Sequence, residues 1–266
     1  MPVAPTTAVD LLPQVVWFKR DLRVQDHAAL ACAMAAGPTL CVYAVELNYW
    51  DQPCTSDRQW QFVRECLISL DAQLNVLGTA LEVHVAPVIQ MLDVLHLRLG
   101  PFALHSHQET GGLWTFERDR AVLAWCQSHG VRWHEYVQNG VVRPVSRRGR
   151  RFREHWQAWA TEPLTQLPAQ AEWLQPASGP PSEVLPAAVK QDPLPCPGRQ
   201  LGGFQHARDL LDSFLAKRGE GYSAHMSAPA TAERGCSRLS PHIAHGSLSL
   251  LLTAVDSRTN PASTAG

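Results

Sequence analysis

Five short runs of β-branched and aromatic residues recur along the first half of the chain, and helix-length segments separate them. Strands that alternate with helices need crossover connections, which pair the strands in parallel and turn to the right. The pattern therefore predicts a doubly wound α/β domain over residues 13–145, built on a parallel five-stranded sheet. The expected strands are residues 15–18, 39–45, 80–85, 102–107 and 131–136.

Two of the intervening segments carry apolar residues at helical spacing. For residues 58–77 the predicted buried stripe is Phe62, Cys66, Leu70, Leu74 and Leu77. For residues 115–129 it is Phe116, Val122, Leu123 and Cys126. We expect both stripes to pack against the sheet.

The composition changes after this domain, because nine of the twenty prolines lie between Thr161 and Gln200. Proline removes a backbone donor and fixes φ, so this stretch is expected to stay outside helices and sheets and to run extended along the surface. We interpret residues 146–201 as an interdomain linker.

A second, helical domain is expected over residues 202–256. It opens at Gly202 and Gly203, and an amphipathic segment runs from Phe204 to Leu215 and closes at Gly219. Only about 65 residues remain there, which is short for an independent core without a metal or disulfide. Residues 257–266 are small, polar and aperiodic and are expected to form a disordered tail.

The composition is that of an ordinary soluble protein, with 45% hydrophobic residues and a formal net charge of −1. This balance favours neither a nucleic-acid partner nor a membrane. One cluster of basic residues stands out from this near-neutral composition. We interpret the cluster as a solvated loop, because no aromatic residues that could stack on bases lie among its members. Its members are Arg147, Arg148, Arg150, Arg151 and Arg153. The N-terminus lacks the pattern of a signal peptide, so a cytoplasmic location is expected.

A cluster of charge follows the first expected strand, at Lys19, Arg20, Asp21 and Arg23. In an open parallel sheet, ligands bind beyond the carboxyl ends of the strands, so these side chains are candidates for a binding crevice. An internal ion-pair network that fixes the turn explains them equally well. The sequence leaves both interpretations open.

His105 and His107 form an HxH pair at the end of the fourth expected strand. No acidic or cysteine residue stands at a spacing that would complete a ligand set. We therefore expect no metal site and interpret the pair as ordinary strand-end residues.

The segment VVWFKRDLRVQDHAAL, from Val15 to Leu30, resembles the opening strand of the photolyase/cryptochrome flavoproteins. The resemblance continues at residues 56–70, in HQETGGLWTFERDRAV at residues 107–122 and in QNGVVRP at residues 138–144. It implies an α/β domain that houses an antenna chromophore, such as a folate or a deazaflavin. Which antenna this chain would hold is not readable from the residues.

A second motif, MSAPATAERGCSRLSPHIAHGSLS, runs from Met226 to Ser249. Ser240 suits an N-cap and Pro241 the first helical position, and free N–H groups at such a helix start attract phosphate. One Ser-Pro start alone is most often only a cap. The wider string, however, closely resembles the family's flavin-binding segment, which implies that the FAD contacts are Tyr222, Cys236, Ser237, Arg238, Leu239 and Ser240.

By this resemblance, the expected activity is that of a deoxyribodipyrimidine photolyase, a carbon–carbon lyase that repairs pyrimidine dimers in DNA by light-driven electron transfer from reduced FAD. The expected partner is damaged DNA, and the expected state is a monomer. Because the family continues beyond the position of Ser249 through a long helical domain, we expect a C-terminally truncated chain that is inactive and holds no stoichiometric FAD. The sequence assigns no catalytic residue. It leaves open a cryptochrome-like blue-light receptor or a non-catalytic antenna-domain remnant.

Overall fold

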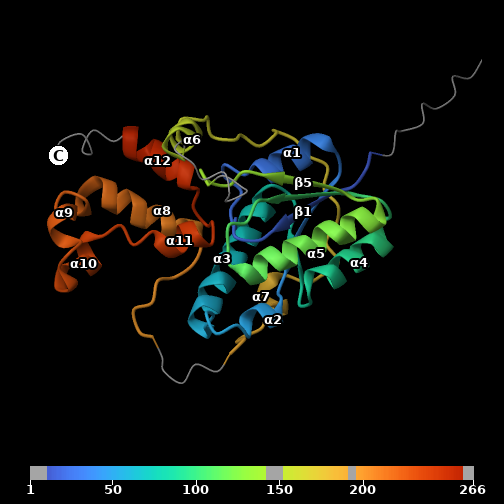
Figure 1. Cartoon of the computed structure of the whole chain (residues 1–266), viewed down its shortest axis with the longest axis horizontal. Coiled ribbons are helices and arrows are strands. Elements are labelled where there is room, and N and C mark those ends of the chain that lie inside the picture. Colours follow the sequence, from blue (N-terminus) through green and yellow to red (C-terminus); the bar gives the residue numbers. More distant parts are fainter. Residues whose placement is uncertain (1–10, 142–151, 191–195, 260–266) are drawn as a thin grey trace, which may run out of the picture.

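The computed structural model describes residues 11–141, 152–190 and 196–259 (Figure 1). Its centre is a parallel five-stranded sheet with strand order β3-β2-β1-β4-β5. The predicted α/β class and strand number are therefore confirmed, and no strand end differs from the expected one by more than one residue. The strands are β1 (Gln14–Phe18), β2 (Thr39–Ala44), β3 (Leu81–His84), β4 (Ala103–His107) and β5 (Arg132–Tyr136).

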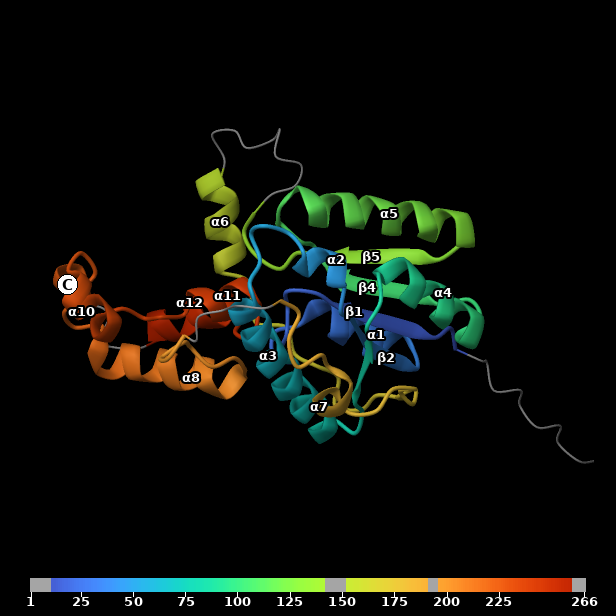
Figure 2. The same ribbon diagram turned by 90° about the horizontal axis from the view of Figure 1, so that it is seen from below.

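Helices cover both faces of the sheet (Figure 2). Alternate side chains of β1 point to opposite faces, so Val16 and Phe18 join the core under α1 and α3, whereas Val15 and Trp17 join the core under α4 and α5. Strands buried on both faces read as continuous apolar runs, which is why β1 and β2 were readable. The helices of this domain are α1 (Ala28–Ala36), α2 (Leu47–Trp50), α3 (Asp57–Val76), α4 (Val88–Leu99) and α5 (Leu113–His129).

The predicted stripe of α3 is buried as far as Leu74, and Leu77 follows the helix as its C-cap. The stripe predicted for α5 is wrong at Phe116 and Leu123, which are 60% and 48% exposed. Phe116 and Leu123 each follow a buried residue, Thr115 and Val122. Because successive side chains lie about 100° apart around a helix, both are turned off the buried side. That side consists of Thr115, Asp119, Val122, Trp125 and Cys126.

The proline-rich stretch is more structured than expected. Trp173 forms a parallel bridge with Thr39, where the Thr39 N–H donates to the Glu172 carbonyl at 2.9 Å and the Leu174 N–H donates to the Thr39 carbonyl at 2.9 Å. Residues 169–175 contain no proline, so their backbone groups remain able to pair with the sheet. Two helices lie within the predicted linker, α6 (Phe152–Ala160) and the single turn α7 (Pro181–Val184).

A helical lobe lies beside the α/β domain in both ribbon views (Figures 1 and 2). It docks where Gly202 meets α3, so closely that a Cβ at that position would lie 2.1 Å from the Phe62 carbonyl oxygen. Its small core contains Ala207, Leu211 and Leu239. The elements are α8 (Phe204–Ser213), a π-helical turn η2 (Phe214–Arg218), α9 (Tyr222–His225), α10 (Pro229–Gly235), α11 (Ser240–Ala244) and α12 (Leu250–Thr259).

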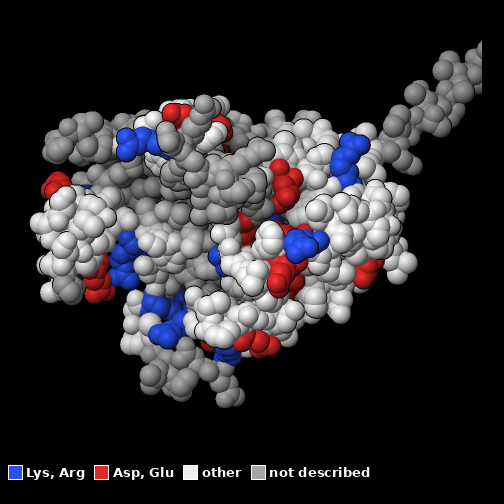
Figure 3. Space-filling model, in the orientation of Figure 1, with Lys and Arg blue, Asp and Glu red and all other residues white. Residues whose placement is uncertain are grey.

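The predicted division into residues 13–145, 146–201 and 202–256 remains a prediction. Residues 257–259, assigned to the tail, instead form the last turn of α12, and residues 260–266 lie outside the described part. In the basic cluster, Arg153 is exposed on α6, whereas Arg147, Arg148, Arg150 and Arg151 lie outside the described residues. On the face drawn in Figure 3, basic and acidic side chains occur in small neighbouring groups. No helix in the described ranges is long and apolar enough to span a membrane.

Candidate functional site

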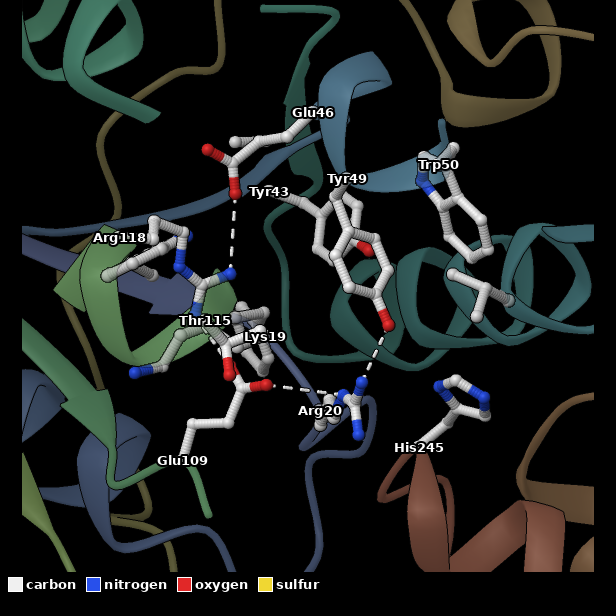
Figure 4. A pocket seen from close by; sticks show the side chains of 14 residues that line it. Lys19, Arg20, Tyr43, Glu46, Tyr49, Trp50, Glu109, Thr115, Arg118 and His245 are labelled. Atoms are coloured by element: carbon white, nitrogen blue, oxygen red, sulfur yellow. Dashed lines mark hydrogen bonds and ion pairs between the residues drawn. The ribbon is translucent and has the colours of Figure 1, made fainter. Parts of the chain in front are cut away.

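A cavity opens beyond the carboxyl ends of β1, β2 and β4 (Figure 4). Lys19 and Arg20 follow β1 directly, Glu46 and Glu109 each follow the last residue of their strand by two positions, and Arg118 reaches in from α5. This is the edge at which open parallel sheets bind ligands. Trp17, Tyr43, Tyr49 and Trp50 add aromatic surface.

Arg118 is the centre of the charge network in this cavity. Its Nη2 lies 2.5 Å from Glu109 Oε2 and 2.9 Å from Asp119 Oδ1, and its Nη1 lies 3.3 Å from Glu46 Oε2. Burial alone lowers the pKa of Arg118, but the three carboxylates raise it above its ordinary value. The guanidinium also stacks 4.8 Å from the centre of the Trp17 ring. Arg118 is therefore held in place from several sides.

Arg20 lies at the mouth of the cavity. Its Nε is 3.3 Å from Glu109 Oε1, and its Nη2 donates to Tyr49 Oη at 2.7 Å. His245 faces it from the helical lobe, and burial, together with Arg20 and His242, lowers the pKa of His245 to about 4. His245 is therefore neutral near pH 7, and both lobes line this cavity.

The cavity is mostly filled by its own side chains. It spans about 480 Å³ including its open mouth, but a water molecule can be centred in only about 40 Å³ of it. A chromophore would therefore have to displace a side chain. The Arg20 side chain is 34% exposed, against 12% for that of Arg118, so Arg20 is the one that can swing out.

Behind the cavity, Asp21 is fully buried between two histidines. His107 Nδ1 donates to Asp21 Oδ2 at 2.8 Å, His27 Nε2 donates to the same oxygen at 3.0 Å, and the Lys19 N–H donates to Oδ1 at 2.7 Å. Burial raises the pKa of Asp21, but the two histidines more than offset this, and the pKa lies well below its usual range. Burial lowers the pKa of His107 to about 4.

Asp21, His27 and His107 are also close enough to suggest a metal site, since their ligand atoms lie within 4.8 Å of one another. The tautomer of His27 argues against it. The Leu30 N–H donates to His27 Nδ1 at 3.0 Å, so the proton of the neutral ring is on Nε2, which donates it in the hydrogen bond to Asp21. A metal on Nε2 would require an imidazolate. His105 has different partners, Tyr136 Oη at 2.9 Å and Gln14 Oε1 at 2.8 Å.

The structure thus answers the question left open for the first motif. Asp21 belongs to an internal hydrogen-bond network, and Arg23 donates to the carbonyls of Gln25, Asp26 and Gly246. Lys19 and Arg20 do line a cavity, although both are paired within it. Asp26 reaches the helical lobe by accepting a hydrogen bond from the Ser249 hydroxyl.

The second motif, residues 226–249, contains α10, α11 and the loop between them. The prediction that Ser240 is the N-cap is wrong by one residue, because α11 begins at Ser240, Leu239 occupies the cap position, and no side chain caps the helix. Tyr222 is 40% exposed at the start of α9, with its ring edge-on to Phe214 at 5.7 Å. Within the described residues, no hydrogen bond joins the Tyr222 side chain to the loop.

The loop has a backbone shape that suits an anion. Arg238 has a φ of 62°, in the left-handed region, and Leu239 follows at φ −82° and ψ −10°, in the right-handed region. Successive residues of opposite hand turn their N–H groups toward one concave side, a shape that binds phosphate. Across the described ranges, the N–H groups of Ser237, Arg238 and Ser240 donate to no protein acceptor, whereas the Leu239 N–H donates to Ser237 Oγ at 3.5 Å. This donor set fits the diphosphate of a dinucleotide.

The family model for DNA photolyase matches residues 14–176, which is more than half of the chain. The chain belongs to the DNA photolyase family. The deoxyribodipyrimidine photo-lyase of Vibrio cholerae is 26% identical over 253 residues, covering 89% of this chain and 53% of that relative. Cryptochrome-1 of Arabidopsis thaliana is 40% identical over 85 residues, covering 30% of this chain and 12% of that relative.

Solved structures share the photolyase fold. A cryptochrome of Synechocystis sp. PCC6803 superimposes with a TM-score of 0.76 at 18% identity and covers 96% of this chain and 58% of its own. A class III photolyase of Agrobacterium tumefaciens superimposes with a TM-score of 0.74 at 20% identity, covering 97% of this chain and 55% of its own. The chain therefore spans little more than half the length of these photolyase-type proteins.

Proposed function

We propose that this chain belongs to a photolyase-type flavoprotein whose loop between α10 and α11 binds the diphosphate of FAD. The activity proposed for a form that completes the flavin site is light-driven repair of pyrimidine dimers in DNA, and the 266-residue chain alone is proposed to be inactive. One observation carries the proposal: the motif that resembles the family's flavin segment folds into a concave loop with unpaired N–H groups. The archaeal photolyase of Sulfolobus tokodaii, whose fold matches with a TM-score of 0.72 at 19% identity, binds two FAD molecules.

Reduced FAD, when bound, supplies the electron for dimer splitting. The chain's own residues bind and orient it. Ser237, Arg238 and Ser240 offer backbone N–H groups to the diphosphate. The Arg238 guanidinium pairs with Glu233 at 3.0 Å and would have to exchange this partner to reach a phosphate. Tyr222, exposed on α9, and Cys236, at the start of the loop, are the further proposed contacts.

The cavity beyond β1, β2 and β4 is the proposed site of an antenna chromophore, a folate or a deazaflavin. Its aromatic walls suit a planar ring, and Arg20 can turn from Glu109 toward an anionic group of the ligand. The cavity also includes His245 from the lobe that carries the flavin loop. An absorbing ligand here would thus lie against both lobes, and this placement favours transfer of excitation to a flavin because the efficiency of transfer rises as the distance falls.

The test is a light-dependent repair assay with dimer-containing oligonucleotides and reduced FAD. It is run on this chain and on any longer form that the nucleotide sequence beyond the Gly266 codon encodes in any frame. Loss of dimers in the light and none in the dark supports the proposal. Absence of repair by every form that binds reduced FAD overturns the assignment as a photolyase.

A cryptochrome-like light receptor is the second candidate, because cryptochrome-1 of Arabidopsis thaliana matches 30% of the chain and a cryptochrome structure matches its fold. Flavin photoreduction without any repair of dimers would favour it. A chain that binds neither FAD nor a folate or deazaflavin would favour the third alternative, a non-catalytic remnant of the antenna domain.

A further inference from the structure

Arg218 lies behind the flavin loop and ties it to α8. Its Nη1 donates to the Cys236 carbonyl, its Nη2 donates to the Leu210 carbonyl at 2.7 Å and the Ser237 carbonyl at 3.4 Å, and its Nε donates to Ser213 Oγ at 3.0 Å. One guanidinium thus holds two successive peptide groups of the loop and the C-terminal turn of α8. Its own position comes from the π-helical turn η2, a type of irregularity often found at functional sites.

The direction of these hydrogen bonds fixes the direction of the free N–H groups. In a trans peptide the carbonyl and the N–H point to opposite sides. Because the carbonyls of Cys236 and Ser237 point to Arg218, the N–H groups of Ser237 and Arg238 must point away from it. Those are two of the three N–H groups that find no acceptor among the described residues.

We propose that Arg218 is a positioning residue for the flavin diphosphate: it orients the peptide groups of the loop 236–240 so that their N–H groups converge on the phosphates. This inference rests on the proposed flavin function. Arg218 does not touch the ligand, because its donors are directed at protein oxygens on the inner side of the loop. Its role is therefore geometric, and charge alone cannot replace it.

The geometry makes lysine the decisive substitution. The Arg218→Lys variant would keep the positive charge, but a single ammonium cannot reproduce the planar fork that spans three carbonyls. Hydrogen bonds from a charged donor are stronger than those between neutral groups, so their loss weakens the support of the loop. A loop that loses part of this support samples other peptide orientations and binds the diphosphate more weakly.

The matched control is Arg234→Gln on α10. Arg234 is exposed, lies two residues before the loop and makes no hydrogen bond or ion pair that the structure describes. The substitution removes a charge near the same site and leaves the support of the loop intact. Comparing it with Arg218→Lys separates orientation from electrostatic attraction.

Because FAD is not expected to stay bound in stoichiometric amount, the whole chain and both variants are titrated with added FAD, ADP and riboflavin at fixed salt, and thermal unfolding checks that each variant is folded. We expect Arg218→Lys to lower the affinity for FAD and for ADP about tenfold. Arg234→Gln is expected to change both affinities by less than about threefold. Riboflavin lacks phosphate, so neither substitution is expected to change the affinity for it. Faster amide exchange at residues 237–240 in Arg218→Lys would accompany the loss.

The outcomes separate the two levels of the proposal. If the unaltered chain binds FAD or ADP and Arg218→Lys binds it equally well, or loses riboflavin to the same extent, the positioning role is wrong and the flavin site stands. If the unaltered chain binds neither FAD nor ADP, the proposed flavin site itself fails, and the role of Arg218 fails with it.

Discussion

The Arg23 guanidinium donates a 3.1 Å hydrogen bond to the carbonyl of Gly246, 223 positions away along the chain. Next to it, the Leu22 N–H donates to the His245 carbonyl at 3.2 Å, and the Ser249 hydroxyl donates to Asp26. The turn after β1 therefore joins the helical lobe to the sheet. The same motif that identifies the family also fixes the lobe that carries the proposed flavin loop.

Gly246 is expected to be the most sensitive position of this contact. A Cβ there would lie 2.2 Å from the Arg20 carbonyl oxygen and 2.5 Å from Asp21 Cα, at a φ of +67°. We expect Gly246→Ala to lower the free energy of unfolding by about 3 kcal/mol or more, from the overlap and the left-handed backbone together. Urea denaturation measures it.

Gly130 provides the control, because it has a φ of +66° with nothing within 4 Å of an added Cβ. Gly130→Ala should lose only about 1–2 kcal/mol, the cost of the backbone conformation. If both variants lost the same free energy of unfolding, the close contact at Gly246 would contribute nothing to stability.

Ser249 links the two lobes through its hydroxyl. It donates to Asp26 and accepts from the N–H groups of Leu251 and Leu252 at 3.1 and 3.2 Å, which makes it the cap of α12. We expect Ser249→Ala to destabilise the protein by about 2 kcal/mol, because a cap and a hydrogen bond to a carboxylate are both lost. Ser223→Ala, at an exposed position of α9 in the same lobe, should change stability by about 0.5 kcal/mol or less in the same denaturation assay.

The sheet was predictable because its strands are buried on both faces, so β1 and β2 read as unbroken apolar runs such as Val15 to Phe18. The buried stripe of α5 could not be predicted from the apolar pattern, because Phe116 and Leu123 face solvent while Thr115 and Asp119 face inward. Asp119 is buried since it pairs with Lys19 and Arg118, and a helical pattern alone does not show such a partner.

The cavity was predicted in part. Lys19 and Arg20 were candidates because they end a strand, and the same rule applied to β2 and β4 would have found Glu46 and Glu109. The Asp21 cluster could not be found by spacing, because His27 and His107 come from different elements. The proposed flavin loop receives hydrogen bonds at two of its carbonyls from Arg218, which no motif identified.

Arg118 is expected to be indispensable to the cavity, whether or not a ligand binds. Replacing it with methionine leaves Glu46, Glu109 and Asp119 without their shared cation. Removing one partner from a buried charge network costs about 3–5 kcal/mol, and we expect a loss of that size for Arg118→Met in denaturation experiments. Arg208→Met removes more exposed ion pairs and should cost about 1 kcal/mol or less. Similar losses for both would contradict the central role of Arg118.

Stability is expected to fall in acid between about pH 6.5 and pH 4, because of His107. Its pKa is about 4 in the folded protein, against roughly 6.5 in an unfolded chain, so the unfolded state binds the proton first as pH falls. The stability from the neutral ring is complete above about pH 6.5 and declines by up to about 3 kcal/mol toward pH 4. His27, whose pKa burial also lowers, acts in the same direction, whereas the contribution of Asp21 is lost only below about pH 3.8.

Asparagine at position 107 tests this mechanism, since its amide N–H stands where His107 Nδ1 donates to Asp21 and cannot take up a proton. We expect His107→Asn to flatten the dependence of the unfolding free energy on pH by about one proton between pH 6.5 and pH 4. His107→Ala removes the donor as well, so it should be less stable than His107→Asn at pH 7. An unchanged slope in His107→Asn, measured by urea denaturation at intervals across this range, would assign the acid sensitivity to other groups.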